Sequence, residues 1–262
     1  MSTPVLQVTG LSMDFGGIHA MSELDLDVQA GEIVALIGPN GAGKTTFFNC
    51  VTGIYNPTAG DILLQPPDGK PVRLNGLKPN KVTEQGMART FQNIRLFSNM
   101  TVLENVMIGR HCRTRSYIAG AVFRNRNTRR EEQESVDKSY AILEKIGLAE
   151  MVNEFAKNLP YGAQRRLEIG RALATEPFLL LLDEPAAGMN PQETQDLDEL
   201  ITRIRNEGHS ILLIEHDMKL VMSLSDRIFV MDYGRKIAQG SPQEVSANPD
   251  VIKAYLGEDG DA

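Results

Sequence analysis

The sequence is built around residues 33–46, where an apolar run leads into a glycine-rich turn and then into a segment that carries Phe47, Phe48 and Val51. The turn matches the pattern Gly-x-x-x-x-Gly-Lys-Thr. Its glycines permit backbone torsions and close approaches that a Cβ atom would forbid, so successive N–H groups can point at one anion from the start of a helix. The turn is therefore predicted to cradle the phosphates of a nucleotide. The residues predicted to contact the nucleotide in this phosphate loop are Gly38, Pro39, Asn40, Gly41, Ala42, Gly43, Lys44, Thr45 and Thr46.

Two side chains of the phosphate loop carry distinct chemistry. Lys44 is expected to reach the β- and γ-phosphates. Thr45 is expected to offer its hydroxyl to Mg²⁺, a hard cation that prefers oxygen ligands and usually keeps several waters. A glycine-rich loop that arose by chance is the alternative, and the complete pattern between a strand and a helix disfavours it.

Length and composition limit the remaining possibilities. With 262 residues, of which 42% are hydrophobic and 23% charged, the chain can form one large α/β domain or two small ones. The net charge of −7 disfavours nucleic acid as a partner, because a duplex-binding protein normally shows a basic face. No apolar run approaches the roughly 20 residues of a membrane-spanning helix, so a cytoplasmic location is expected. Cys50 and Cys112 are isolated and predict neither a disulfide framework nor a zinc site.

Periodicity predicts strands alternating with helices along most of the chain. Strands are expected at 5–8, 24–28, 33–37, twice within 61–74, and at 178–182, 210–214, 227–231 and 235–239. Helices are expected at 78–88, 101–108, 131–146, from 158–162 onward, and at 192–207. Thr101 is expected to cap the second of these helices, with Glu104 as its capping-box partner. This alternation indicates a largely parallel sheet, whose ligands collect beyond the carboxyl ends of the strands.

Polar side chains follow two of the expected buried strands. Asp183 and Glu184 come directly after one apolar run, and His216 follows the next. All three are therefore expected to converge on the nucleotide held by Lys44. Lys44 and a magnesium ion, held by Thr45 and through water by Asp183, would neutralise charge on the transferred phosphoryl group, while Glu184 orients or deprotonates water. A solvated surface carboxylate is the alternative role for either acid.

Two further features leave alternatives open. Phe15 lies beside a glycine pair and is either a core anchor or a flat platform for an adenine. An arginine-rich segment with no acid before Glu131 is either the solvated face of a connecting helix or a contact for anionic lipid headgroups or an acidic partner. Its arginines are Arg110, Arg113, Arg115, Arg124, Arg126, Arg129 and Arg130.

Five motifs stand in the order found in the nucleotide-binding subunits of ABC transporters, and the chain resembles that family over almost its whole length. The motifs are the loop 38–45, Gln92, residues 159–162, residues 181–185 and His216. The resemblance implies an α/β fold: a P-loop ABC ATPase with a mainly parallel core sheet, an N-terminal antiparallel β part and an inserted helical subdomain. It implies a single domain over 1–262, with 1–92 and 175–262 as catalytic core and 93–174 as the helical subdomain.

The resemblance also implies the roles of individual residues, with ATP and Mg²⁺ as cofactors. The implied catalytic residues are Glu184 as base, His216 as switch histidine and Gln92 of the Q-loop. The implied nucleotide contacts beyond the phosphate loop are Phe15, by stacking, and Pro160, Tyr161 and Gly162 of the signature motif. The implied magnesium ligands are Thr45, Gln92 and Asp183, and residues 187–190 would form the D-loop.

Residues 158–169 and 184–191, with the arginine-rich insertion, look most like the ATPase subunit of branched-chain amino-acid importers. This implies ATP hydrolysis on the inner face of the cell membrane, with transmembrane permease subunits as partners. Another small solute such as urea is an alternative cargo, and a soluble ABC ATPase is an alternative class, although that class should carry a coiled coil or a second cassette. A P-loop kinase or GTPase is disfavoured because residues 80–83 lack the acid of a guanine-selecting Asn-Lys-x-Asp.

Four substitutions depart from the usual family motifs. Pro160 replaces the serine of the usual signature motif, Tyr161 replaces its first glycine, and Ala163 replaces its glutamine. Asn190 occupies the D-loop position where many members carry aspartate. ABC sites are expected to form between two chains, so a homodimer would lack the serine hydroxyl at both sites. A heterodimer with a paralogous ATPase that keeps the serine is therefore expected in preference to self-association.

Overall fold

The computed structural model of the chain describes residues 4–67, 69–113 and 126–256. One set of strands comprises β3 (Ile33–Ile37), β6 (Met87–Arg89), β7 (Leu179–Asp183), β8 (Ser210–Ile214), β9 (Arg227–Asp232) and β10 (Arg235–Gly240). A second set comprises β1 (Leu6–Phe15), β2 (Ile18–Val28), β4 (Ala59–Leu64) and β5 (Val72–Arg73). The helices are α1 (Lys44–Val51), α2 (Pro79–Glu84), α3 (Val102–Arg110), α5 (Arg126–Lys145), α6 (Tyr161–Leu173), α7 (Pro191–Asn206), α8 (Met218–Leu224), α9 (Pro242–Ser246) and α10 (Pro249–Leu256). Short 3₁₀ helices lie at His111–Arg113, Ala149–Met151 and Ala156–Asn158.

The strands form two sheets. In the described part of the chain, the core sheet has the order β10-β9-β3-β8-β7-β6, and the second sheet has the order β2-β1-β4-β5. Every pairing in the core sheet is parallel except that of β10 with β9. The pairings of the second sheet are antiparallel. The predicted mainly parallel core and antiparallel N-terminal part are therefore confirmed.

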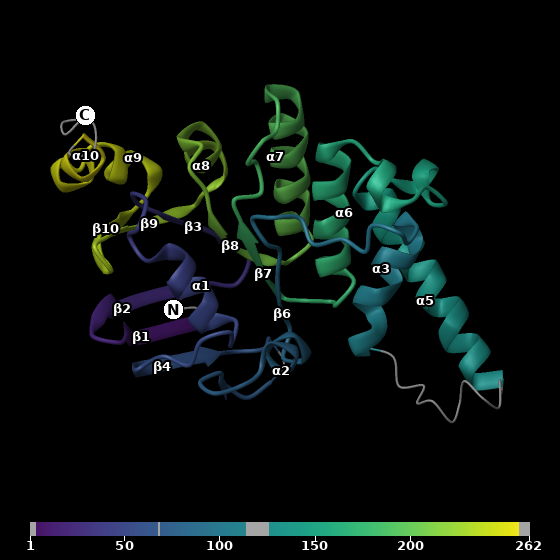
Figure 1. Cartoon of the computed structure of the whole chain (residues 1–262), viewed down its shortest axis with the longest axis horizontal. Helices are drawn as coiled ribbons and strands as arrows, with labels where there is room; N and C mark the ends of the chain where they lie inside the picture. The colour runs from purple at the N-terminus through teal and green to yellow at the C-terminus, as the bar shows by residue number, and fades with distance from the viewer. Residues whose placement is uncertain (1–3, 68, 114–125, 257–262) are drawn as a thin grey trace.

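The sequence of β3 explains how the core sheet is buried on both faces. Successive side chains of a strand point to opposite faces. The odd-numbered residues of β3 pack into one hydrophobic cluster with α3, α6, α7 and α8, and the even-numbered ones pack into another with α1 and the antiparallel sheet. Figure 1 shows α7 and α8 on one side of the strands and α1 with β1 and β2 on the other. The fold is thus layered, and continuous apolar runs form its central strands.

Helices α3, α5 and α6 gather at one end of the molecule, beside α7 and away from α9 and α10 (Figure 1). Helix α3 begins with the capping box that the sequence predicts. The Glu104 amide donates to Thr101 Oγ1 over 3.2 Å, and the Thr101 amide donates to Glu104 Oε2 over 2.7 Å. These helices fall within the range predicted for a helical subdomain, whose boundaries stay a prediction.

Two predicted helix boundaries are wrong. The helix expected over 78–88 ends at Glu84 because Gly86 turns the chain with φ of 99°. The following residues instead form β6, which pairs with β7 along Met87 to Arg89. The helix expected from residue 131 already begins at Arg126.

The first arginines of the arginine-rich segment are tied into the protein. Arg110 is 5% exposed, and its Nη1 atom bonds to Glu176 Oε1 over 3.0 Å. Arg113 Nε donates to the Thr175 carbonyl over 2.7 Å. For Arg110, both the solvated-face and the lipid-contact interpretation are wrong, whereas Arg113 is half-buried and both interpretations stay open for it. Arg130 is exposed, whereas Arg115, Arg124 and the side chains of Arg126 and Arg129 lie outside the described residues.

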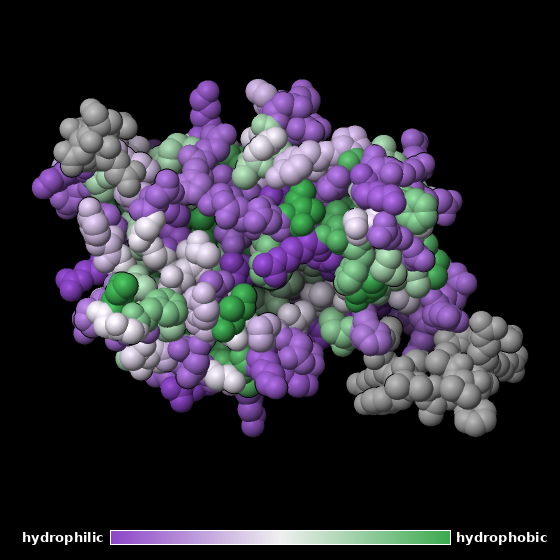
Figure 2. Space-filling model, viewed as in Figure 1, coloured by the Kyte–Doolittle hydropathy of each residue, from purple (hydrophilic) through white to green (hydrophobic). Residues whose placement is uncertain are grey.

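The surface carries apolar side chains in several separate groups among hydrophilic ones on the face seen in Figure 2. Exposed large examples in the helical region are Phe97, Met151 and Phe155. Among the described residues, no helix combines the length and the apolar character that crossing a membrane requires.

Candidate functional site

The phosphate loop joins β3 to α1, and the packing around it requires glycine at two positions. A Cβ atom on Gly38 would lie 2.0 Å from the carbonyl oxygen of Met231 in β9. A Cβ atom on Gly43 would lie 2.8 Å from the carbonyl oxygen of Ala20 in β2. Both glycines also have positive φ, of 149° and 98°. The loop is therefore held between β9 and β2 in a conformation that other residues disfavour.

Lys44 is the first residue of α1 and is only 6% exposed. Its Nζ atom donates to the carbonyl oxygens of Gly38 and Pro39 over 2.6 and 2.7 Å. The ammonium group is thus held against the loop whose backbone N–H groups and helix dipole favour an anion. Thr45 follows it and is exposed.

A hollow of about 450 Å³ lies at this loop. One part of its lining is Asn40, Gly41, Ala42, Gly43, Lys44, Thr45 and Thr46, and the rest is Ile18, His19, Ala20, Glu184, His216, Tyr233 and Gly234. Segments far apart in the sequence therefore meet around the loop, since β3, β7 and β8 end at the same edge of the sheet.

Glu184 follows β7 and contacts two of the residues predicted to act with it. Gln92 Nε2 donates to Glu184 Oε2 over 2.6 Å, and His216 Nε2 lies 2.6 Å from Glu184 Oε1. The Glu184 side chain is 15% exposed, and its backbone has a φ of 47°, which is uncommon for a non-glycine residue. Gln92 and His216 therefore both contact Glu184, which lies beside the phosphate loop, while the roles of the three residues in catalysis stay predictions.

Asp183, the predicted magnesium ligand at the end of β7, forms an ion pair that the sequence did not predict. Its Oδ2 atom lies 2.6 Å from Arg89 Nη2, and both side chains are less than 10% exposed. Arg89 also donates to Asn49 Oδ1 over 2.8 Å and lies over the ring of Phe91. The sequence did not single out Arg89, because the helix expected over 78–88 hid the strand β6 that places Arg89 next to Asp183.

The signature residues lie apart from the hollow that Lys44 lines. Pro160 is the N-cap of α6, and Tyr161 is 43% exposed. A Cβ atom on Gly188 would lie 3.4 Å from the Tyr161 ring, and one on Gly162 would lie 2.6 Å from Glu193 Oε1. The signature motif therefore packs against the predicted D-loop and the start of α7 within the same chain.

Phe15 ends β1 and is 40% exposed. Its ring packs edge-on against Tyr55 with 5.2 Å between the centroids. The core-anchor interpretation of Phe15 is therefore wrong, and the adenine-stacking role stays a prediction.

Comparison with known proteins places these contacts in a family. Residues 21–187 match the ABC transporter family, and residues 235–261 match the branched-chain amino acid ATP-binding cassette transporter family. The chain is 51% identical over 259 residues to the high-affinity branched-chain amino acid transport ATP-binding protein LivG of Escherichia coli (strain K12), covering 98% of this chain and 100% of the relative. This chain is an ABC transporter ATPase. Its identity to the corresponding protein BraF of Pseudomonas aeruginosa is 49%, with the same coverage.

Solved structures agree with this family membership. This ABC ATPase superposes on the ADP conformation of MJ1267, an ATP-binding cassette of an ABC transporter, with a TM-score of 0.83 and 28% identity, covering 98% of this chain and 100% of the other. A nucleotide-free ATP-binding cassette from an ABC transporter gives a TM-score of 0.82 with 29% identity, covering 97% and 99%. The predicted P-loop ABC ATPase fold is thereby confirmed.

Glu215 is a further residue at the site of this ABC ATPase that sequence analysis missed. It is 3% exposed, and its carboxylate accepts hydrogen bonds from the backbone amides of Ala186 and His216 over 2.7 and 2.9 Å. Burial raises the pKa of this carboxyl group above its usual value, although the backbone hydrogen bonds oppose the shift. An acid directly after an apolar strand and before His216 was the available signal. Glu215 joins the turn after β8 to the turn after β7.

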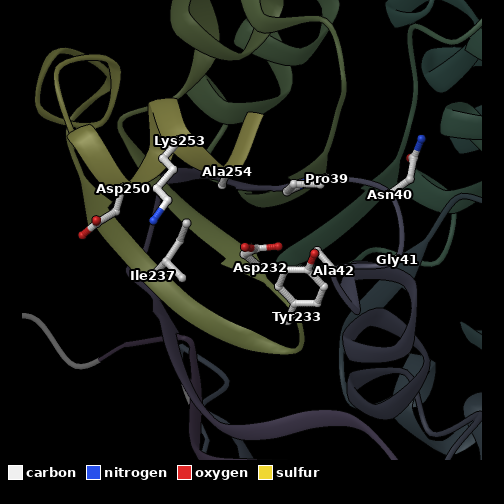
Figure 3. A pocket seen from close by; sticks show the side chains of 10 residues that line it. All are labelled: Pro39, Asn40, Gly41, Ala42, Asp232, Tyr233, Ile237, Asp250, Lys253 and Ala254. Carbon is white, nitrogen blue, oxygen red and sulfur yellow. The ribbon is translucent and has the colours of Figure 1, made fainter. Parts of the chain in front are cut away.

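A larger hollow of about 660 Å³ also borders the phosphate loop. Figure 3 shows it between Pro39 and Asn40 of the loop and Asp250 and Lys253 of α10, with Tyr233 also lining it. Lys44, Thr45, Glu184 and His216 line the smaller hollow and are absent from the lining of the larger one, so the residues predicted to act on the nucleotide gather at the smaller hollow.

Proposed function

We propose that this ABC ATPase hydrolyses ATP to power the import of branched-chain amino acids through a transmembrane permease. The cargo is supported by the names of the relatives and by the family match at residues 235–261. The ATPase chemistry is supported above all by one observation: Glu184 lies in hydrogen-bond contact with both Gln92 and His216 beside the phosphate loop.

Each contact suggests a role in hydrolysis. Lys44 offsets phosphate charge in a nearly buried position, where an electrostatic interaction is stronger than in water. Glu184 orients or deprotonates the attacking water, which requires at least one of its two present hydrogen bonds to open. His216 holds the γ-phosphate. Gln92, through its hydrogen bond to Glu184, couples the position of Glu184 to the helical region.

The oxygen donors near the loop fit a magnesium ion. In the described residues no group of three or more His, Cys, Asp or Glu side chains forms a metal site by itself. Magnesium in nucleotide sites is usually held by only one or two protein ligands, with phosphates and water completing the shell. Thr45 would bind the ion directly and Gln92 would offer its amide oxygen, while the carboxylate of Asp183, which is paired with Arg89, would act through a water molecule. The bound ion would neutralise charge on the phosphates.

The separation of Pro160, Tyr161 and Gly162 from the Lys44 hollow supports a site shared between two chains. The signature helix α6 would close over the nucleotide of a partner ATPase. Because Pro160 offers no hydroxyl, we propose a paralogous partner that keeps the signature serine.

A surface of the helical region supports the permease contact. Phe97 and Phe155 are 48% and 45% exposed. A backbone hydrogen bond joins the two segments that carry these rings: the amide of Ala156 donates to the carbonyl of Met100 over 2.9 Å. Exposed aromatic side chains of this kind are enriched at protein interfaces, so the permease would dock here and hold the ATPase at the inner membrane face.

Uptake by membrane vesicles that contain the assembled transporter tests the whole proposal. ATP enclosed in the vesicles, on the side of the membrane where this chain lies, should drive uptake of labelled leucine, isoleucine and valine. Lys44→Ala should abolish this uptake, because charge neutralisation at the phosphates is lost. Urea is the control solute. Uptake of urea without the amino acids would reject the cargo, and full uptake with Lys44→Ala would reject the site.

A further inference from the structure

Helix α6 contains an ion pair that is removed from solvent. Arg165 Nη1 lies 2.9 Å from Glu168 Oε2, and the two side chains are 0% and 2% exposed. Burial raises the pKa of the Glu168 carboxyl group, and the Arg165 charge opposes this shift. Charged groups are costly to bury unless they are paired and hydrogen-bonded. The backbone groups that hydrogen-bond to this ion pair therefore indicate its role.

The partners lie in the backbone of residues 91–95, which we call the Q-segment. Arg165 donates through Nη1 to the carbonyl of Phe91 over 2.6 Å and through Nη2 to the carbonyl of Gln92 over 2.7 Å. Glu168 Oε1 accepts from the amides of Arg95 and Phe91 over 3.2 and 3.4 Å. The guanidinium fork and the carboxylate thus hold the Q-segment from both sides of Gln92.

The Q-segment also reaches the catalytic site. Gln92, whose carbonyl Arg165 holds, donates its side-chain amide to Glu184. In the other direction, Arg165 Nη2 lies 3.4 Å from the hydroxyl of Tyr161, whose ring packs against Gly188. One buried guanidinium group therefore touches both the segment that contacts Glu184 and the signature residue beside the D-loop.

A purely stabilising role does not account for this arrangement. Desolvation offsets much of the coulombic gain of a buried ion pair, and apolar residues of similar volume often stabilise a protein as well or better. Backbone groups of the Q-segment would instead be left without partners if the pair were lost, so the segment would be released from α6.

We propose that the Arg165–Glu168 pair is a positioning element that fastens the Q-segment to the signature helix, so that Gln92 moves relative to Glu184 only together with α6. The inference rests on the proposed roles of Glu184 and Gln92 in hydrolysis. Closure of α6 over a partner's nucleotide would then set the distance between Gln92 and Glu184 in this chain. Arg165 and Glu168 act through Gln92 and need not touch ATP.

A double-mutant cycle in the assembled transporter tests the proposal. The variants are Arg165→Met/Glu168→Gln, Gln92→Ala, and all three substitutions together, with kcat and KM for ATP measured on each. We expect the pair variant to lower kcat about tenfold or more, because small displacements of a positioned group are costly. KM should change less than about threefold, because the phosphate loop is untouched. Gln92→Ala should lower kcat strongly in the wild type but by less than about twofold in the pair variant.

Equal losses from Gln92→Ala in both backgrounds would overturn the proposal, as would a pair variant with unchanged kcat. If the pair variant does not fold, the same cycle is run with Arg165→Lys, which keeps the charge but cannot span both carbonyl oxygens. Arg227→Met is the matched control, because Arg227 binds Asp27 and Glu32 at the far side of the fold. It should leave the loss from Gln92→Ala unchanged. Normal turnover with Glu184→Gln would reject the proposed function itself, independently of the cycle.

Discussion

At the scale of single residues, the site depends on side chains that each have more than one partner. Glu184 is held by Gln92 and His216, and Glu215 holds the backbone at His216 and Ala186. Removing one such group changes both the chemistry and the position of its neighbours. Predictions at this scale therefore separate binding from turnover, and pH dependence from overall stability.

Glu184→Gln should keep ATP binding and lose turnover. The amide can hold a water molecule without accepting its proton, and loss of a general base lowers the rate by about a hundredfold or more. Equilibrium ATP binding and steady-state hydrolysis measure the two effects. Glu150→Gln, an exposed substitution, is the control. A fall in ATP affinity as large as the fall in turnover would assign Glu184 a structural role.

Glu215 should make folding stability depend on pH in a specific direction. Its pKa is raised in the folded protein, so the folded state binds this proton more tightly than the unfolded state does. This contribution to stability is fully present below the unfolded pKa, and it is lost as pH rises through the folded pKa. Wild type should therefore gain stability relative to Glu215→Gln as the pH falls from neutrality toward 4.5, the ordinary pKa of a glutamate carboxyl group. Denaturant unfolding of both proteins checks the sign, and a difference that stays constant with pH would contradict it.

At the scale of elements, the helix starts carry the clearest local signals. The capping boxes of α3, α7 and α9 are complete, and Asn190, the residue that departs from the usual D-loop aspartate, caps α7 by accepting from the Glu193 amide over 3.0 Å. Asn190 thus has a structural role that its motif position did not predict. The cap of α3 offers the simplest measurement.

Thr101→Ala should lower the free energy of unfolding by about 1 kcal/mol, because the amide of Glu104 loses its side-chain acceptor at the start of α3. Chemical denaturation measures the change. Thr101→Ser keeps the hydroxyl and should stay close to wild type. Equal losses for alanine and serine would mean that the methyl group, rather than the cap, supplies the stability.

At the scale of the whole molecule, the signature motif and the phosphate loop of one chain lie apart. Pro160 does not line the hollow that contains Lys44. Under the proposed function, dimerisation would be part of the mechanism, and the chemistry of the Pro160 position would decide how well a second copy of this chain can serve as the partner.

Pro160→Ser should strengthen ATP-dependent dimerisation of the isolated chain. A hydrogen bond from the new hydroxyl to the γ-phosphate contributes about 1.5 to 3 kcal/mol, which corresponds to about tenfold or more in the dimer dissociation constant. Sedimentation with ATP and concentration-dependent turnover measure the effect. Pro160→Ala controls for the loss of the proline ring. Serine also favours the N-cap position of α6, and denaturant unfolding without ATP measures that separate gain in stability. Tight ATP-dependent dimerisation of the wild type, with no gain from serine, would contradict the argument from the missing hydroxyl.

The sequence by itself determined the features that depend on local chemistry. The phosphate loop, the apolar runs of β7 and β8, and the Thr101 cap could be predicted because each is encoded by neighbouring residues. The convergence of Glu184 and His216 could also be predicted, since parallel strands present their carboxyl ends at one edge.

Only the tertiary structure decided the contacts between distant segments. β6 forms because β7 supplies a pairing edge for residues 87–89, although a helix fits the sequence there. The pairing brings Arg89 to Asp183, and long-range packing likewise brings Arg110 to Glu176 and Arg165 to the Q-segment. From the sequence alone, a charged side chain is expected to be exposed to solvent. It can be buried only where the fold places a counter-charge or a carbonyl oxygen within hydrogen-bond distance.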